Sequence, residues 1–343
     1  MAVKFRFYTA LCALLIASIC AAQAPARAAP APAEIEVPAW FKASFLDLRD
    51  DLKEATAGRK RLVLYFGQNG CPYCKRLMEV NFTQPEIVAK TRRHFDMVEI
   101  NIFGSREVSW LDGKTRSEKE LAALLKVQFT PTLLFLDERG EIALRVNGYY
   151  PPPRFNAALD YVSQRRERQE IFAVYLSRTQ PAAHAAGPRD ETLFRPAPFV
   201  LDRRKPAARP LAVFFEQPDC AACDEMHATA LKAGATRALL SRFDVYRLDV
   251  TSPVPMVSPA GEDTTAADWA RKLNVSYTPS MVLFDAAGRE VFRVEAYVRT
   301  FHLQSALDYV ASRAYANEPN FQRYIQARAD ARRARGERVD VME

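Results

Sequence analysis

The sequence predicts an α/β protein of two tandem domains with one architecture, each a mixed sheet flanked by helices. Three observations predict it. A Cys-x-x-Cys motif at residues 71–74 recurs 149 positions later at 220–223, an apolar strand precedes each motif, and the segment Ala-Leu-Asp-Tyr-Val occurs at both 158–162 and 306–310. A period near 148 residues has the length of a domain and far exceeds a solenoid repeat. We therefore expect each copy to have its own core.

The same series of elements is expected in both copies: strand, Cys-x-x-Cys, helix, strand, helix, Thr-Pro, two strands and a closing helix. Turns at Gly140 and Gly288 should join the last two strands of each copy into a hairpin. Only the first copy shows a helix before its first strand, at 45–56, so the second domain should begin differently. The apolar strand segments are 61–66, 95–98 and 133–136 in the first copy and 211–215, 243–246 and 281–284 in the second.

Composition divides the chain into five segments, and a stretch rich in proline separates the two copies. We assign a signal peptide with an Ala/Pro-rich stretch to 1–33, a first domain to 38–178, a linker to 179–198, a second domain to 199–326 and a basic tail to 327–343.

The N-terminal segment has the pattern of a secretory signal. Lys4 and Arg6 precede an apolar run of 16 residues at 7–22, and small residues suited to cleavage follow it. The run is shorter than the roughly 20 residues that cross a membrane, although a retained anchor or lipidation at Cys20 are alternatives. We expect a periplasmic protein with no stable membrane insertion after signal cleavage.

The net charge of +7 raises the question of a nucleic-acid partner. The excess positive charge lies in dispersed patches, such as 203–205 and 332–333, without the interleaved aromatic residues on which bases stack. We interpret these patches as solvated surface and expect no nucleic-acid partner.

The four cysteines of the motifs, Cys71, Cys74, Cys220 and Cys223, are the candidate catalytic residues. The start of a helix stabilises the thiolate of the first cysteine of each motif, so Cys71 and Cys220 should be the nucleophiles. We expect both to be exposed. The second cysteines, one turn along and mostly buried, should resolve the mixed disulfide that forms. A shared zinc site or an inert clip is the alternative, but 145 residues separate the two motifs.

Further charged residues distinguish the second motif from the first. His227 follows Cys223 by four positions and could be a third metal ligand, but no other ligand has an obvious claim. We therefore expect a lone surface histidine and no metal. Lys75 and Arg76 follow the first motif, whereas Asp219, Asp224 and Glu225 surround the second, so the thiolate should be more favoured at the first site.

The order of elements in both copies resembles the thioredoxin fold, and the segment 99–132 resembles the SoxW-type periplasmic thioredoxins associated with bacterial thiosulfate oxidation. The resemblance implies that Pro131 and Pro279 are cis-prolines beside the dithiols. Thr130 and Thr278 would then offer backbone groups to an extended substrate strand.

One position departs from the pattern of many thioredoxins. They keep a buried carboxylate six residues before the first cysteine, where this chain has Tyr65 and Phe214. The proton of the resolving thiol must then pass to water or to another group.

These observations predict a periplasmic thiol:disulfide oxidoreductase that reduces protein disulfides, with redox-active disulfides and no other cofactor. We expect a membrane electron donor to restore the reduced state, and the resemblance implies client proteins of sulfur oxidation or cytochrome c maturation. A thiol oxidase or isomerase is the first alternative. A non-catalytic module of this fold that binds proteins or metals is the second.

Overall fold

The computed structural model describes residues 34–180, 189–295 and 298–339. The expected signal segment at 1–33, with Cys12 and Cys20, lies outside these residues, as do residues 181–188 of the expected linker and the last four residues of the tail. Residues Glu34–Glu343 belong to one compact unit.

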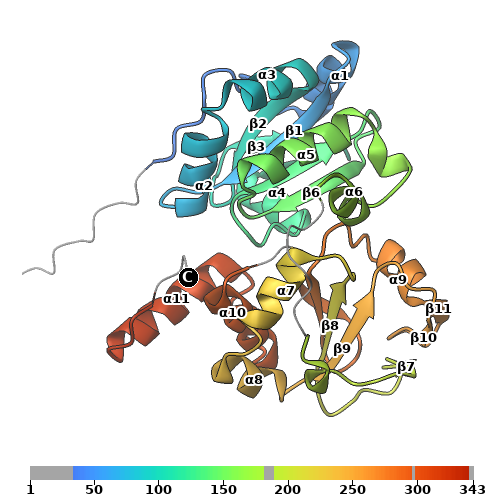
Figure 1. Ribbon diagram of the computed structural model, residues 1–343. Coiled ribbons are helices and arrows are strands. Elements are labelled where there is room, and N and C mark those ends of the chain that lie inside the picture. Colours follow the sequence, from blue (N-terminus) through green and yellow to red (C-terminus); the bar gives the residue numbers. More distant parts are fainter. Residues whose placement is uncertain (1–33, 181–188, 296–297, 340–343) are drawn as a thin grey trace, which may run out of the picture. The chain divides into compact units, whose positions relative to one another are not determined.

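The first domain is built on a four-stranded mixed sheet in the order β2-β1-β5-β6 (Figure 1). The central strand β1 pairs with β2 in parallel and with β5 antiparallel, and β5 forms the expected hairpin with β6. The strands are β1 Arg61–Gly67, β2 Phe95–Asn101, β5 Thr132–Leu136 and β6 Ile142–Asn147, with a separate hairpin of β3 Glu107–Ser109 and β4 Thr115–Ser117.

Every residue of β1 is buried, because its alternate side chains supply two cores on opposite faces of the sheet. Val63 and Tyr65 contribute to one core, and Leu62, Leu64 and Phe66 to the other. The helices that cover these faces are α1 Leu48–Ala57, α2 Pro72–Arg76, α3 Pro85–His94, α4 Glu118–Leu124, α5 Pro152–Ser163 and α6 Phe172–Thr179, and a π-helical turn, η1 Leu77–Asn81, extends α2.

The second domain repeats this sheet in the order β13-β12-β8-β9. Strand β8 is again parallel to one neighbour, β9, and antiparallel to β12, which forms the second expected hairpin with β13. The strands are β8 Leu211–Glu216, β9 Asp244–Asp249, β12 Ser280–Phe284 and β13 Glu290–Val294, and the helices are α7 Ala221–Ala228, α8 Gly234–Leu240, α9 Ala266–Lys272, α10 Thr300–Ala311 and α11 Phe321–Ala334.

The two domains begin differently, as expected. The first begins with α1, while the second begins with the short strand β7, Phe199–Val200, which pairs with β10, Pro255–Val257, beside β11, Asp263–Thr265. The prediction that the first helix starts at residue 45 was wrong. Leu46 has a φ of 63°, and the side chain of Asp47 accepts hydrogen bonds from the backbone of Arg49 and Asp50, so the helix begins at Leu48.

The basic patch at 203–205 is not simply solvated surface, which corrects the prediction. Arg203 is buried, and its guanidinium donates to the Asp244 carboxylate over 2.7 Å. Arg204, next to it, is exposed and pairs with Asp202. Much of the local positive charge is therefore neutralised within the domain.

The first part of the predicted basic tail, residues 327–334, belongs to helix α11, Phe321–Ala334. Helix α11 continues to Ala334, and Ile325 and Ala329 on it are buried against the second core. Arg332 and Arg333 pair with Glu337 and Asp330.

The Asp244 carboxylate lies between buried Arg203 and half-exposed Arg195. We predict that Asp244→Ala lowers the free energy of unfolding of the second domain by about 3 kcal/mol, because it leaves a buried guanidinium unpaired. Glu262→Ala removes an exposed partner of Lys272 and should cost less than about 1 kcal/mol. Urea unfolding of both variants checks this; equal costs would contradict it.

Candidate active site: two dithiols at helix starts

The first dithiol lies where the chain leaves β1 and enters α2. Cys71 is the N-cap residue, and its sulfur accepts a hydrogen bond from the backbone N–H of Cys74 over 3.0 Å. Pro72 follows at the first helical position, where its missing N–H costs nothing. Cys71 and Cys74 form a disulfide, with their Cα atoms 5.2 Å apart.

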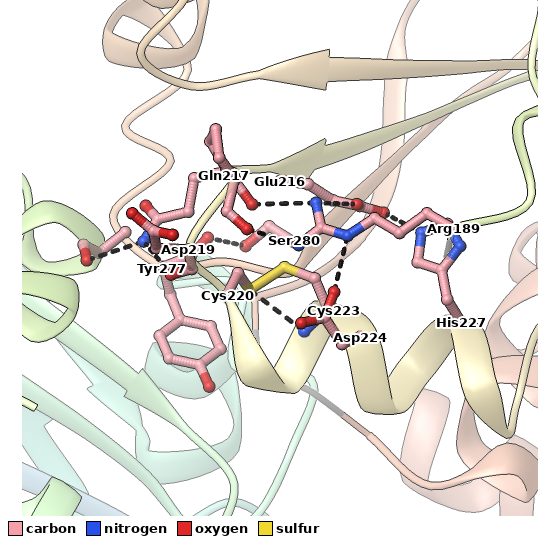
Figure 2. The surroundings of a disulfide bond; sticks show 12 residues. Arg189, Glu216, Gln217, Asp219, Cys220, Cys223, Asp224, His227, Tyr277 and Ser280 are labelled. Carbon is pink, nitrogen blue, oxygen red and sulfur yellow. Dashed lines mark hydrogen bonds and ion pairs between the residues drawn. A yellow bond between two sulfur atoms is a disulfide. The ribbon is translucent and has the colours of Figure 1, made fainter. Parts of the chain in front are cut away.

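The second dithiol repeats this arrangement between β8 and α7 (Figure 2). Cys220 caps α7, and its sulfur accepts from the backbone N–H of Cys223 over 3.1 Å. The two cysteines form a disulfide with the same Cα separation of 5.2 Å. In both copies an N–H of the first helical turn therefore points at the first sulfur, where it stabilises a negative charge once the disulfide is reduced.

The first cysteines are not exposed, which corrects the prediction. Cys71 is 3% and Cys220 7% exposed, while Cys74 and Cys223 have no exposed surface. Cys71 and Cys74 belong to the main core cluster of the first domain, and Tyr277 of the second domain belongs to the same cluster.

The Thr-Pro loops lie beside the dithiols. The Thr130–Pro131 and Thr278–Pro279 peptide bonds are both cis, as is a third bond at Pro198 that the sequence reading did not single out. The sulfur of Cys71 lies 3.5 Å from the carbonyl oxygen of Thr130.

Each Thr-Pro loop is held by a hydroxyl of the strand that follows it. Thr132 donates to the carbonyl oxygen of Phe129, and Ser280 donates to that of Tyr277. Tyr277 and Ser280 are among the surroundings of the second disulfide in Figure 2. The structure thus places a Thr-Pro loop at each dithiol.

The residue before each Thr-Pro pair contacts the other repeat. Phe129 packs against Phe292 and Phe321 with ring centroids 5.7 and 5.4 Å apart, and Tyr277 lies 5.6 Å from Tyr150. The guanidinium of Arg154 lies 5.2 Å from the centre of the Tyr277 ring.

These contacts cover the loops, so Thr130 and Thr278 are buried. The backbone groups that were expected to bind a substrate strand are therefore not open surface in this arrangement.

The family model described as a thioredoxin-like domain matches residues 48–163 and 200–311, which is more than half of the chain. The chain belongs to the thioredoxin-like family. No curated protein matches the sequence.

Three solved structures illustrate the likeness. A thioredoxin-fold protein from Helicobacter pylori is 28% identical over 33% of this chain and 74% of its own, with a TM-score of 0.31. A thioredoxin from Thermus thermophilus is 24% identical over 34% of this chain and 83% of its own, with a TM-score of 0.27. The oxidised C-terminal domain of DsbD from Neisseria meningitidis is 17% identical over 37% of this chain and 99% of its own, with a TM-score of 0.27. The finer resemblance to the SoxW type stays a prediction.

The second thioredoxin-like domain contains a buried acid–base pair that the sequence reading missed. Glu216 and His227 are 2% and 3% exposed, and the Nε2 atom of His227 lies 2.8 Å from Oε1 of Glu216. His227 is therefore not a surface histidine, which corrects that expectation. The available signal was a glutamate at the end of a fully apolar strand, four residues before Cys220.

Uncharged groups from both domains contribute to the surroundings of the first dithiol: the Tyr65 hydroxyl from β1, and the His302 ring from α10 of the second domain. Burial raises the pKa of the Tyr65 hydroxyl, and a smaller effect of Glu99 acts in the same direction. His302, whose ring lies 6.2 Å from that of Tyr73, has its pKa lowered to about 4 by burial. Both side chains are neutral at pH 7.

The acidic residues around the second dithiol are less free than the sequence suggested. Asp224 pairs with Arg189 over 2.9 Å, and Glu225 lies 3.9 Å from Arg299. Their effect on the thiolate is therefore weaker than their number implies. Within the residues described, no group of three or more His, Cys, Asp or Glu side chains is placed to hold a metal ion.

The geometry predicts an order of reactivity within each reduced dithiol. Cys71 should be alkylated roughly tenfold or more faster than Cys74, and Cys220 faster than Cys223, because only the first sulfurs accept a helical N–H and the second are fully enclosed. Pulse alkylation with iodoacetamide at neutral pH, followed by peptide mass spectrometry, measures all four rates. Equal rates within a pair would contradict the assignment.

Proposed function

We propose that this protein is a thiol:disulfide oxidoreductase that reduces the disulfides of client proteins in the periplasm. One observation carries the proposal. In each thioredoxin-like domain the first sulfur of a disulfide accepts a backbone N–H at a helix start, with a Thr-Pro loop beside it. This is the environment that makes a thiolate available for exchange at neutral pH.

The reaction has two steps. In the reduced first domain, the Cys71 thiolate attacks one sulfur of the client disulfide, and the other client sulfur leaves and takes up a proton. Cys74 then loses its proton and attacks the sulfur of Cys71, which releases the second client sulfur. The client gains two electrons and the dithiol loses two. Cys220 and Cys223 perform the same steps in the second domain.

Access to the sulfurs is part of the proposal. Cys71 and Cys220 are almost fully covered, and Phe129 and Tyr277 connect each Thr-Pro loop to the other repeat. A client segment must displace these contacts before it can pair with the backbone of Thr130 or Thr278. The protein should therefore react faster with flexible clients than with rigid ones.

The partners follow from the chemistry and from the N-terminal segment. A dithiol donor, which we place in the membrane, restores the reduced state, and no cofactor beyond the cysteines is needed. Clients of sulfur oxidation or cytochrome c maturation fit an exported reductase, and we assign no nucleic-acid partner. Among the described residues, no helix is both long and apolar enough to span a bilayer.

We predict that dithiothreitol-dependent insulin reduction needs the first cysteine of at least one pair. Cys71→Ser and Cys220→Ser should each lower the rate, and the double variant should fall to the uncatalysed rate, because no attacking thiolate remains. Turbidity of the released insulin B chain reports the rate. Lys205→Ser, at an exposed position before β8, is the control and should match the unaltered protein.

Unchanged activity of the double variant would contradict the proposal and favour a non-catalytic binding module. Net oxidation of reduced, unfolded ribonuclease at a rate above that of insulin reduction would instead favour an oxidase.

A further inference from the structure

The buried Glu216–His227 pair includes a residue of α7, the helix that carries the resolving cysteine of the second dithiol. His227 follows Cys223 by four residues on α7, so both side chains leave the helix on the same face. Figure 2 shows this face, with the disulfide and the imidazole on one side of the helix. Cys223 has no exposed surface, and bulk water therefore has no direct route to its sulfur.

The pair has capacity for a proton. Oε1 of Glu216 lies 2.8 Å from Nε2 of His227, and the Nδ1 atom of His227 is buried without a hydrogen-bond partner among the described residues. A neutral imidazole beside a carboxylate can take up a proton and become an ion pair. The ring of Phe194 packs against the imidazole, 5.8 Å away between centroids, and shields it from solvent.

Cations compensate the buried carboxylate. Arg189, from the segment before the second domain, donates to Oε2 of Glu216 over 3.1 Å and also pairs with Asp224. Arg247 on β9 lies 4.0 Å from the same oxygen and pairs with exposed Glu191. These are the charged groups that face the pair from the neighbouring elements. These cations offset the cost of a negative charge on Glu216 in the interior.

The first domain cannot hold such a pair. Its residues at the same positions of the repeat are Gly67 and Met78. A Cβ atom at Gly67 would lie 2.5 Å from the hydroxyl oxygen of Tyr65, so this hydroxyl fills the space into which a longer side chain would extend. In the second domain the tyrosine is replaced by Phe214, which leaves room for Glu216. Tyr65 and Gly67 of the first domain thus correspond to Phe214 and Glu216 of the second. This difference indicates that the buried pair is a specific feature of the second site.

We propose that Glu216 and His227 act as the proton acceptor of Cys223, an inference that rests on the proposed function. In the mixed disulfide of Cys220 with a client, Cys223 gives its proton to the pair and its sulfur attacks that of Cys220. The Cys220–client bond breaks, the client sulfur leaves as a thiolate and takes a proton from water, and the Cys220–Cys223 bond forms. When a dithiol donor later reduces the disulfide, the pair returns the proton.

The test follows the two steps separately in the full chain carrying Cys71→Ser and Cys74→Ser, so that only the second dithiol reacts. Mixing the reduced protein with 5,5′-dithiobis(2-nitrobenzoate) releases one nitrothiolate when Cys220 attacks and a second when Cys223 resolves. The first phase depends on reagent concentration and the second does not. Absorbance at the nitrothiolate band records both phases.

Glu216→Gln, which keeps the shape of the side chain and its contact with His227, should slow the second phase by roughly tenfold or more at pH 7 and leave the first unchanged. The difference should disappear near pH 10, at which a thiol ionises without help. His227→Gln should do the same. Glu262→Gln, an exposed carboxylate of the same domain that pairs with Lys272, is the matched control and should leave both phases unchanged.

Two results would overturn the inference while leaving the proposed function intact. The first is an equal rate of the second phase at pH 7 in the Glu216→Gln variant and the parent protein. The second is a slowing of that phase that persists at pH 10, as expected of a structural defect. Absence of the first phase in the parent protein would refute the proposed function itself, and this inference with it.

Discussion

The contact on which both candidate sites depend is the hydrogen bond from a first-turn backbone N–H to a cysteine sulfur. It is made by Cys74 to Cys71 and by Cys223 to Cys220. Its geometry is fixed because each helix follows directly from a fully buried central strand, β1 or β8, that is paired on both sides. A sulfur placed in this way requires no positive side chain to favour its thiolate. The rigid part of each domain therefore supplies the chemistry, and the surrounding residues adjust it.

The surroundings of the two sulfur pairs have diverged although their frames have not. At the position of Glu216 the first domain has Gly67, beside which the Tyr65 hydroxyl fills the space, whereas the second site contains a buried carboxylate, an imidazole and the guanidinium of Arg189. Because Arg189 comes from the segment between the repeats, the chain that joins the domains also completes the second site. The two dithiols are therefore not duplicates, and a different proton path at each one would let them resolve mixed disulfides at different rates.

Much of the fold could be predicted because the sequence contains two copies of the domain. An element predicted in one copy can be checked against the equivalent segment of the other. The hairpins at Gly140 and Gly288 are predicted at equivalent positions in both copies, and the structure confirms both. The start of α1 was predicted too early, since apolar Phe45 fits a helical pattern while the backbone at Leu46 does not.

The parts that escaped prediction depend on contacts between segments with no common pattern. Glu216 and His227 come from a strand and a helix, and their pairing follows only from the turn at the dithiol. Burial of Cys71 and Cys220 depends on aromatic contacts such as that of Tyr277 with Tyr150, which join residues more than a hundred positions apart. The sequence motifs predict the two dithiols, but burial and pairing arise from tertiary packing.

The central claim is that the sulfur atoms of Cys71 and Cys220 attack the disulfide of a client protein. The most direct measurement uses the Cys74→Ser and Cys223→Ser double variant, in which a mixed disulfide cannot be resolved. After incubation with an oxidised client such as insulin, non-reducing electrophoresis and mass spectrometry should find the client joined covalently to Cys71 and Cys220. If the protein is folded and the client is joined to neither Cys71 nor Cys220, the result would contradict the account.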